Sequence, residues 1–328
     1  MVLATGNKVE HELDFALGGE MGLYLARTYN HHWSATGLFG RHWISNLDYS
    51  LVPSGDGKIL WVQRPDGRRI KFIQKARSRW EEDKAQAVAY VTREPNGQYL
   101  LRNEANGTEL YDPDGYVVQL RNEQGISWNF GYQDRYLKEV SHSSGRRMTF
   151  TWEGGRLVQV TGPAGAMYRY TYDVNAFGTG TGKHRLASTT RPGEPAMTIQ
   201  YHYEDSRMPG ALTGKSFDGV RYSTFAYDAN RRAISSEHAG GVDRYTFSYV
   251  VEATEQVEPP PAPLPSVMVK GISPLMGWPS EDTTRHTTVY SPADRSAGRA
   301  ELTVVPSTVS SPAETFSPSY ITWTSEPI

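Results

Sequence analysis

The chain has 328 residues, no cysteine, and a formal net charge of −2 from 34 basic and 36 acidic side chains. Without cysteine there can be no disulfide and no cysteine-based metal, nucleophilic or redox site, and the balanced charge gives no whole-chain attraction to nucleic acid. No apolar run approaches the roughly 20 residues that span a bilayer, and the short uncharged start does not have the pattern of a secretory signal.

The first 100 residues predict irregular β-structure. The chain holds 20 tyrosines and 31 glycines, a composition typical of all-β proteins with many turns. Alternating apolar residues indicate short strands at 12–17, 23–25, 60–62, 70–73 and 88–91. We therefore assign residues 1–100 to an N-terminal domain of irregular β-structure.

A repeat follows over residues 101–250, marked by seven aromatic residues at spacings of 21, 20, 20, 31, 24 and 22. These residues are Tyr111, Tyr132, Trp152, Tyr172, Tyr203, Tyr227 and Tyr249. Self-similarity at this period indicates one structural unit stacked on copies of itself. We predict that the seven aromatic residues anchor the repeat structurally, and we assign no residue a catalytic, cofactor-binding or metal-binding role.

The unit is clearest between residues 146 and 160. Met148, Phe150 and Trp152 alternate along one strand, and Gly154 and Gly155 then turn the chain into a second strand. Glycine suits such a turn because it reaches positive φ without steric cost. Neighbouring units repeat this phase, and none shows the i, i+3, i+4 spacing of a helix. The sequence therefore predicts an all-β fold in which hairpins stack into an open, curved strip.

Tyrosine–aspartate pairs near the turns resemble the YD repeat of the Rhs family of bacterial proteins. The pairs are Tyr111-Asp112, Tyr172-Asp173 and Tyr227-Asp228. The N-terminal region is similar to the domain that precedes these repeats, through 5–9, 14–17, 25–30, 37–43 and 65–69. The resemblance covers roughly residues 4–250.

This resemblance implies a function. Proteins of the family form β-sheet cocoons that enclose a toxic C-terminal domain and deliver it to competing bacteria, often through a type VI secretion machine. By that analogy the chain is a non-enzymatic scaffold, a short or truncated part of such a shell, and it needs no cofactor. Its implied partners are a toxin domain, other Rhs shell segments or a type VI spike protein. Its implied location is the bacterial cytoplasm, with export through a specialised secretion system.

Other relatives lie on the cell surface and have been linked to carbohydrates. The alternative function is therefore a glycan-binding or adhesion module whose exposed aromatic residues, such as Trp128 and Trp152, stack on sugars. Core packing competes with this role for the same side chains. The sequence shows no hydrolase motif, and we predict neither nucleic acid binding nor a membrane span.

The character of the chain changes after Tyr249. The last 79 residues hold 12 of the 20 prolines but only 3 of the 31 glycines. Residues 258–265 predict a semi-rigid polyproline II linker, and the serine- and threonine-rich remainder predicts disorder. We assign 251–328 to a proline-rich linker and disordered tail. One hypothesis is that a longer reading frame was interrupted near Val250, which downstream genomic sequence would test.

Three short motifs invite a chemical role but favour a structural one. The segment 112–115, Asp-Pro-Asp-Gly, resembles Rhs segments linked to self-cleavage, yet a single early copy favours a β-turn. The glycine-rich segment 178–184 lacks the first glycine of a phosphate loop and has His184 where Ser or Thr is needed, so we expect a loop extension. His31 and His32 are adjacent and would point to opposite faces of a strand, so no metal site is predicted.

Overall fold

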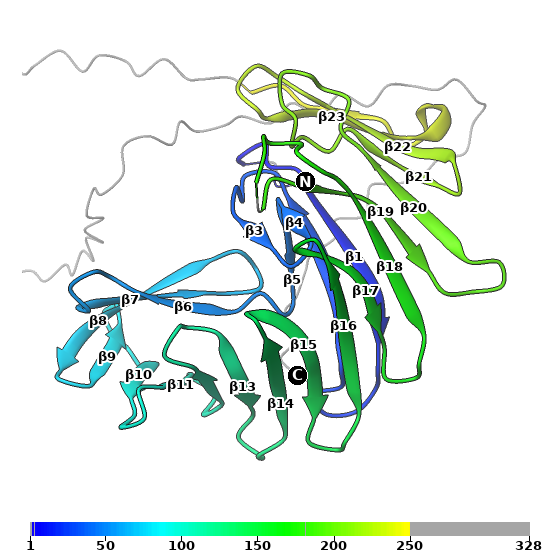
Figure 1. The fold of residues 1–328 in the computed structure, drawn as a ribbon. Helices are drawn as coiled ribbons and strands as arrows, with labels where there is room; N and C mark the ends of the chain where they lie inside the picture. The colour runs from blue at the N-terminus through cyan, green and yellow to red at the C-terminus, as the bar shows by residue number, and fades with distance from the viewer. Residues whose placement is uncertain (1, 3, 181, 250–328) are drawn as a thin grey trace, which may run out of the picture. The chain divides into compact units, whose positions relative to one another are not determined.

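The computed structural model describes residues 2, 4–180 and 182–249 (Figure 1). Over this part the chain is almost entirely antiparallel β-structure, arranged as a long open sheet and a small N-terminal sheet. The predicted all-β fold with an open strip of hairpins is therefore confirmed. The predicted linker and tail, 251–328, lie outside the described residues.

The N-terminal sheet has three strands in the order β1–β2–β5. Its strands are β1 (Val9–Ala16), β2 (Tyr24–Asn30) and β5 (Trp43–Ser45). A bulge interrupts the β1–β2 register between Leu13 and Phe15. A small ribbon of β3 (Thr36–Gly37) and β4 (Gly40–Arg41) lies between β2 and β5 in the chain.

The long sheet has 19 strands, and each pairs with its neighbours in chain order. The strands of its first part are β6 (Ser50–Pro53), β7 (Ile59–Gln63), β8 (Arg69–Ala76), β9 (Arg79–Glu82), β10 (Tyr90–Arg93), β11 (Tyr99–Arg102), β12 (Thr108–Tyr111) and β13 (Val117–Arg121). The central strands are β14 (Ser127–Gln133), β15 (Tyr136–His142), β16 (Arg147–Glu153), β17 (Arg156–Thr161), β18 (Met167–Asp173) and β19 (Arg185–Arg191). The last strands are β20 (Met197–His202), β21 (Gly214–Phe217), β22 (Val220–Tyr227), β23 (Ala233–His238) and β24 (Tyr245–Thr246), with the short 3-10 helix η1 (Ala239–Gly241) before β24.

Alternation along the strands decides which face of the long sheet is buried. On β16, Met148 and Phe150 are buried whereas Thr149 and Thr151 are exposed. The turns between strands use glycine at positive φ, for example Gly145 at 86° after β15 and Gly165 at 81° after β17. One apolar face therefore runs from strand to strand and forms the core.

The long sheet stays open because no strand pairing joins β24 to β6 among the described residues. Its first strand instead folds back against a later turn. Ser50 on β6 forms a bridge with Tyr116, and the Leu51 N–H donates to the Gly115 carbonyl at 3.0 Å. The first strands thus curl into a loop while the remaining hairpins continue as a strip (Figure 1).

Strand pairing passes through the predicted domain boundary at residue 100. The long sheet begins at Ser50, and β10, β11 and β12 pair in sequence across that point. The assignments of 1–100, 101–250 and 251–328 stay predictions.

The N-terminal sheet packs against the apolar face of the long sheet. Phe15 on β1 lies 5.3 Å from Tyr168 on β18, measured between ring centroids, and Trp43 on β5 lies 4.8 Å from Tyr201 on β20. Figure 1 shows β1 running beside β17 and β18. The N-terminal residues therefore cover the centre of the strip and meet its aromatic side chains.

Candidate functional site

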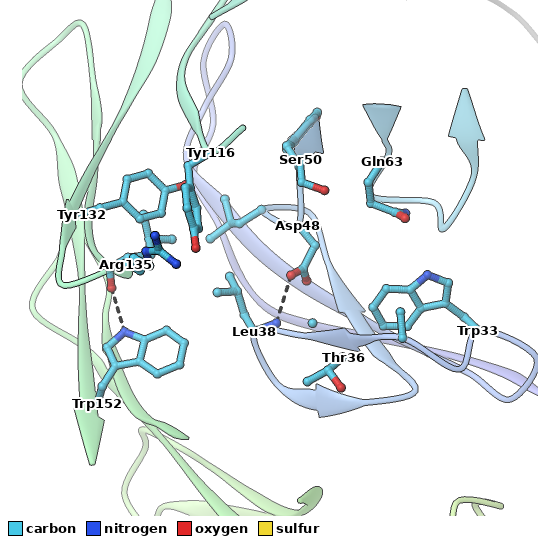
Figure 2. A pocket seen from close by; sticks show the side chains of 15 residues that line it. Trp33, Thr36, Leu38, Asp48, Ser50, Gln63, Tyr116, Tyr132, Arg135 and Trp152 are labelled. Carbon is cyan, nitrogen blue, oxygen red and sulfur yellow. Dashed lines mark hydrogen bonds between the residues drawn. The ribbon is translucent and has the colours of Figure 1, made fainter. Parts of the chain in front are cut away.

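A cavity of about 370 Å³ lies between the N-terminal segment and the repeat hairpins (Figure 2). The N-terminal side contributes Trp33, Thr36, Leu38 and Asp48. The opposite wall comes from Tyr116, Tyr132, Arg135 and Trp152, and the first strands add Ser50 and Gln63. The site therefore exists only because segments distant in sequence are brought together.

Asp48 is the acidic group of this cavity, and its carboxylate is fully engaged. One oxygen accepts a hydrogen bond from the Leu38 N–H at 2.9 Å, and the other accepts from the N–H and hydroxyl of Ser45 at 2.6 and 2.7 Å. Burial raises the pKa of Asp48 to about 6, although these hydrogen bonds act in the opposite direction. The side chain thus holds the loop between Leu38 and Ser45, which is a structural task.

Aromatic rings form the wall that faces Asp48. The rings of Tyr116 and Tyr132 lie 5.3 Å apart, and Trp152 packs 4.9 Å from Tyr136. In Figure 2, Arg135 lies between Tyr132 and Trp152. Planar rings beside a few polar side chains suit a ligand with both an apolar face and hydroxyl groups.

Five of the seven predicted anchors lie on alternate strands of the long sheet, β12, β14, β16, β18 and β22, and Tyr203 directly follows β20. The anchors differ in burial. Tyr111 and Tyr227 are buried, and four others are partly buried against the core: Tyr132, Trp152, Tyr172 and Tyr203. Tyr249 is partly buried and lies outside the strands. No measurement tests the anchoring role itself, so that role stays a prediction.

Four anchors share one hydrogen-bond geometry that the sequence did not reveal. Each donates from its ring tip to a backbone carbonyl 15 or 17 residues earlier in the chain. The bonds join Trp152 to Leu137, Tyr172 to Leu157, Tyr203 to Leu186 and Tyr227 to Leu212, at 2.7, 2.7, 2.9 and 2.7 Å. We call this set the carbonyl ladder.

Each bond of the carbonyl ladder lies just beyond the end of the backbone register between two adjacent strands. The register between β15 and β16 ends at the pair Glu139 and Thr149, short of Leu137. The Trp152 ring reaches from β16 to the Leu137 carbonyl, beyond the last backbone pair of β15 with β16, while Leu137 stays in register with Tyr132 of β14. The same holds for Leu157, because the β17–β18 register ends at Gln159. The aromatic residue therefore extends each strand pair by one side-chain hydrogen bond.

The first two anchors depart from this geometry. The Tyr111 hydroxyl donates to Glu109 at 2.5 Å, and Glu109 also receives the guanidinium of Arg64. Among the described residues, Tyr132 has no hydrogen bond of the ladder type and faces the cavity of Figure 2 instead. The ladder is therefore confined to the hairpins from β16 onward.

The aspartate that follows the anchor closes the turn in two of the three tyrosine–aspartate pairs. Asp112 accepts from the Tyr116 N–H at 2.8 Å, and Asp228 accepts from the Arg232 N–H at 2.9 Å. Aspartate favours such turns because its short side chain reaches the backbone a few residues on. Asp173 instead forms an ion pair with Arg185 at 2.8 Å. The segment 112–115 is thus a turn, as predicted.

Sequence reasoning missed a buried ion pair at the centre of the molecule. Arg27 on β2 is fully buried and donates to both oxygens of Asp14 on β1 at 2.8 and 2.9 Å. Tyr170 also donates to Asp14 at 2.8 Å, while Tyr201 accepts from Arg27 at 3.1 Å. The ion pair therefore ties the N-terminal sheet to β18 and β20 of the long sheet.

A second charged cluster lies next along β1. Lys215 on β21 contacts Glu10 at 2.6 Å and Glu12 at 2.8 Å, and Arg191 on β19 contacts Glu12 at 3.0 Å. Burial opposes the charge on Lys215, but Glu12 and Glu10 raise its pKa. The sequence contains a signal for this cluster, because Glu10, Glu12 and Asp14 stand at alternate positions and so place three carboxylates on one face of a strand.

The remaining candidates have structural surroundings. Trp128 is buried and donates to the Met21 carbonyl at 2.6 Å, so its ring is not available to a sugar. The loop at 178–184 contacts the β3–β4 ribbon through the Arg41 N–H and the His184 carbonyl at 3.3 Å. Within the part of the chain that the structure describes, no group of three or more His, Asp or Glu side chains could hold a metal ion. Nor does that part contain a helix long and apolar enough to cross a membrane.

Comparisons with known proteins agree on one family. A family model described as a domain of unknown function (DUF6531), found in the N-terminal region of Rhs-type proteins, matches residues 2–72. Two proteins of Dickeya dadantii (strain 3937), named probable deoxyribonuclease RhsB and probable deoxyribonuclease RhsA, are each 24% identical over 266 residues. These matches cover 76% of this chain but only 17% of either relative.

Among solved structures, a porin-like protein from Bacteroides uniformis ATCC 8492 aligns with 71% of this chain and 95% of its own. The TM-score is 0.30 and the sequence identity 11%, values too low to establish a shared fold.

Proposed function

This chain belongs to the Rhs family, and from that premise we propose that it is a non-enzymatic scaffold, a segment of an Rhs-type β-sheet shell. The carbonyl ladder is the observation that supports the proposal most directly. In it, four of the repeated aromatic side chains each donate a hydrogen bond from one hairpin to the one before it. A sheet assembled this way grows by adding hairpins in chain order, which is what a wall requires.

The shell would hold a toxin domain away from its targets until delivery to a competing bacterium. Its partners would be that toxin domain, further Rhs shell segments and a type VI secretion spike protein. The chain would be made in the bacterial cytoplasm and leave it through the secretion machine. The curved strip and the relatives' Rhs membership support these steps.

The deoxyribonuclease activity in the relatives' names is not assigned to this chain, because it spans only 17% of their length. Purified chain mixed with plasmid DNA and divalent metal ions should leave the DNA intact. Expression in a susceptible strain should leave growth unchanged. DNA cleavage that co-purifies with the folded chain, or growth arrest on expression, would contradict a scaffold without enzymatic activity.

Glycan binding is the second candidate, and the cavity of Figure 2 favours it because Trp33, Trp152 and Tyr132 line it beside polar groups. A glycan array would test this with the full chain and the variants Trp33→Ala and Trp61→Ala. Trp61 lies on β7 and does not line the cavity, so it is the matched control. Binding lost in Trp33→Ala alone supports the candidate, and absence of specific binding rejects it.

A further inference from the structure

A second cavity, of about 650 Å³, lies where four segments meet away from the cavity of Figure 2. The N-terminal residues between β2 and β5 form one side, and the loops after β18, β20 and β22 form the other. Its ionisable lining residues are His31, His32, Arg41, His42, Arg207 and Arg231. Three arginines and three histidines therefore face one space, and none of the described residues that line it is a carboxylate.

The three arginines differ in how far their charge is already balanced. Arg207 forms a two-point ion pair with Asp205, at 3.0 and 2.7 Å. Within the described ranges, no carboxylate forms an ion pair with Arg41 or Arg231, and Arg41 instead lies 5.0 Å over the ring of Phe177. The buried Arg41 Nε has no hydrogen-bond partner in the part of the chain that the structure describes. Two guanidinium groups thus remain for an anionic ligand.

His31 supplies a further unsatisfied group. The Tyr29 hydroxyl donates to the Gly210 carbonyl at 2.8 Å and accepts from the Leu212 N–H at 3.0 Å. The His31 tautomer that completes this arrangement carries its proton on Nδ1, which lies 3.0 Å from the hydroxyl and donates to its second lone pair. A neutral His31 then carries an unshared lone pair on Nε2, and none of the described residues hydrogen-bonds to this buried atom. The ring is only 7% exposed.

We propose that this cavity binds a phosphate group, free or carried by a small molecule, between Arg41, Arg231 and the histidines. Guanidinium groups match the geometry of phosphate oxygens and donate charge-assisted hydrogen bonds to them. The volume leaves space for an organic substituent on the phosphate. The site is separate from the proposed shell role and goes beyond it.

Binding should be accompanied by proton uptake at His31, because with the Nδ1 proton engaged by Tyr29 only the imidazolium form also offers an Nε2–H donor to the anion. The groups that face His31 are His32, His42 and Arg231, with Tyr29 and Tyr227 against its ring. Burial, together with the positive charge of His42, His32 and Arg231, lowers the pKa of His31 to about 4. A bound anion offsets these positive charges and so favours protonation.

Isothermal titration calorimetry with the full chain tests the site, with inorganic phosphate, glycerol phosphate and sulfate as probes. Arg231→Asn should weaken phosphate binding by about tenfold or more, because it removes a charged donor. Asparagine suits this position, where φ is 64° and the side chain is exposed. Arg207→Gln should weaken binding less, since that guanidinium is already paired, and Arg135→Gln in the other cavity should have no effect.

The proton uptake is measured with sulfate, which does not itself titrate near neutral pH, in two buffers of different ionisation enthalpy. A difference in heat that corresponds to uptake supports the role of His31, and equal heats exclude it. Tighter binding of glycerol phosphate than of inorganic phosphate indicates a carried phosphate, and the reverse indicates the free ion. No binding at about 10 mM phosphate, or equal loss in Arg231→Asn and Arg135→Gln, would overturn the proposal.

Discussion

The N-terminal sheet and the hairpins of the long sheet are held by contacts of opposite kinds. The N-terminal sheet depends on a few buried charges, of which Arg27 and Asp14 are both fully enclosed at the side chain. The hairpins from β16 onward depend on the carbonyl ladder, in which each step is a single neutral hydrogen bond. The stabilisation of the N-terminal sheet is therefore concentrated in a few ion pairs, whereas that of the hairpins is distributed over several weaker hydrogen bonds.

This difference predicts different responses to damage. Removing one member of a buried ion pair leaves the other charge without a partner, at a cost of about 3–5 kcal/mol. Removing one neutral hydrogen bond costs only about 1 kcal/mol. The N-terminal sheet should thus be lost as a unit, whereas the strip should weaken one step at a time.

Arg27→Met should give the largest loss of stability, about 3–5 kcal/mol in the free energy of unfolding. The methionine fills much of the space but leaves the Asp14 carboxylate buried without its two-point partner, with the Tyr170 hydroxyl at 2.8 Å and the more distant Arg191 guanidinium at 3.7 Å. Urea unfolding followed by circular dichroism measures the effect. Hydrogen exchange should show protection lost first in β1 and β2.

Two further variants show whether charge is the cause. Arg27→Met combined with Asp14→Leu should recover part of the loss, because the poorly compensated Asp14 carboxylate is then removed as well. Arg68→Met is the matched control, since the Arg68–Asp66 pair is 74% and 49% exposed and such pairs contribute about 0–1 kcal/mol. A double variant no more stable than Arg27→Met would contradict the charge argument.

Gly115→Ala should come next, with a loss of about 3 kcal/mol. A Cβ there would lie 1.9 Å from the Leu51 carbonyl oxygen, so the contact that folds β6 back would have to open. Gly145 has nearly the same φ, 86° against 89°, but nothing lies within 4 Å of its Cβ position. Gly145→Ala should therefore cost only about 1–2 kcal/mol for the left-handed backbone. Equal melting points for the two variants would show that the β6 contact contributes little.

Repetition made much of the strip predictable from sequence. The spacing from Tyr111 to Tyr249 and the alternation around Met148 and Phe150 both reflect local chemistry, because hairpin strands pair with their chain neighbours. The partners of the aromatic tips could not be predicted. Their acceptors are backbone carbonyls, and whether a carbonyl is available depends on where the neighbouring register ends.

The N-terminal sheet departs from the rule that apolar side chains face the core and charged side chains face the solvent. On β1, Glu12 and Asp14 are buried and Leu13 is 54% exposed. These carboxylates can be buried because Arg27, Arg191 and Lys215 form ion pairs with them. Arg191 and Lys215 lie on the distant strands β19 and β21, so this pairing cannot be read from the local sequence. Both cavities have the same origin, since each joins N-terminal residues to hairpins that lie far along the chain.

Acid should weaken the N-terminal region more than the ladder. Burial lowers the pKa of His31 and of His42 to about 4, so the unfolded chain binds more protons between about pH 6.5 and 4, and stability falls as pH falls. Asp48, with its pKa raised to about 6, acts in the opposite direction below that pH. Two histidines take up protons on unfolding and Asp48 releases one, so the unfolded chain binds about one proton more than the folded chain. The free energy of unfolding therefore falls by about 1.4 kcal/mol per pH unit, or about 2 kcal/mol from pH 6.5 to 5.

The variant His42→Asn isolates one of these protons. Asparagine tolerates the φ of 66° at this position and can still donate to the Trp33 carbonyl, which lies 3.0 Å from His42 Nδ1. Its unfolding free energy should depend less steeply on pH than that of the parent chain, in buffers free of phosphate. Identical slopes would mean that His42 is protonated as easily in the folded chain as in the unfolded one.

The smallest effects should lie in the carbonyl ladder, and they should reveal where the two regions meet. Tyr172→Phe removes one donor and leaves the Leu157 carbonyl without it, for a loss of about 0.5–1 kcal/mol. Tyr203→Phe should cost about 1.5 kcal/mol, because the Tyr203 hydroxyl donates to Leu186 and also accepts from Trp43 on β5 at 3.0 Å. Thermal unfolding of both variants, with Tyr245→Phe on the exposed β24 as control, gives the comparison. If Tyr172→Phe proved the more damaging, the contact with the N-terminal sheet would add nothing to the ladder, and the two regions would be energetically separate at that step.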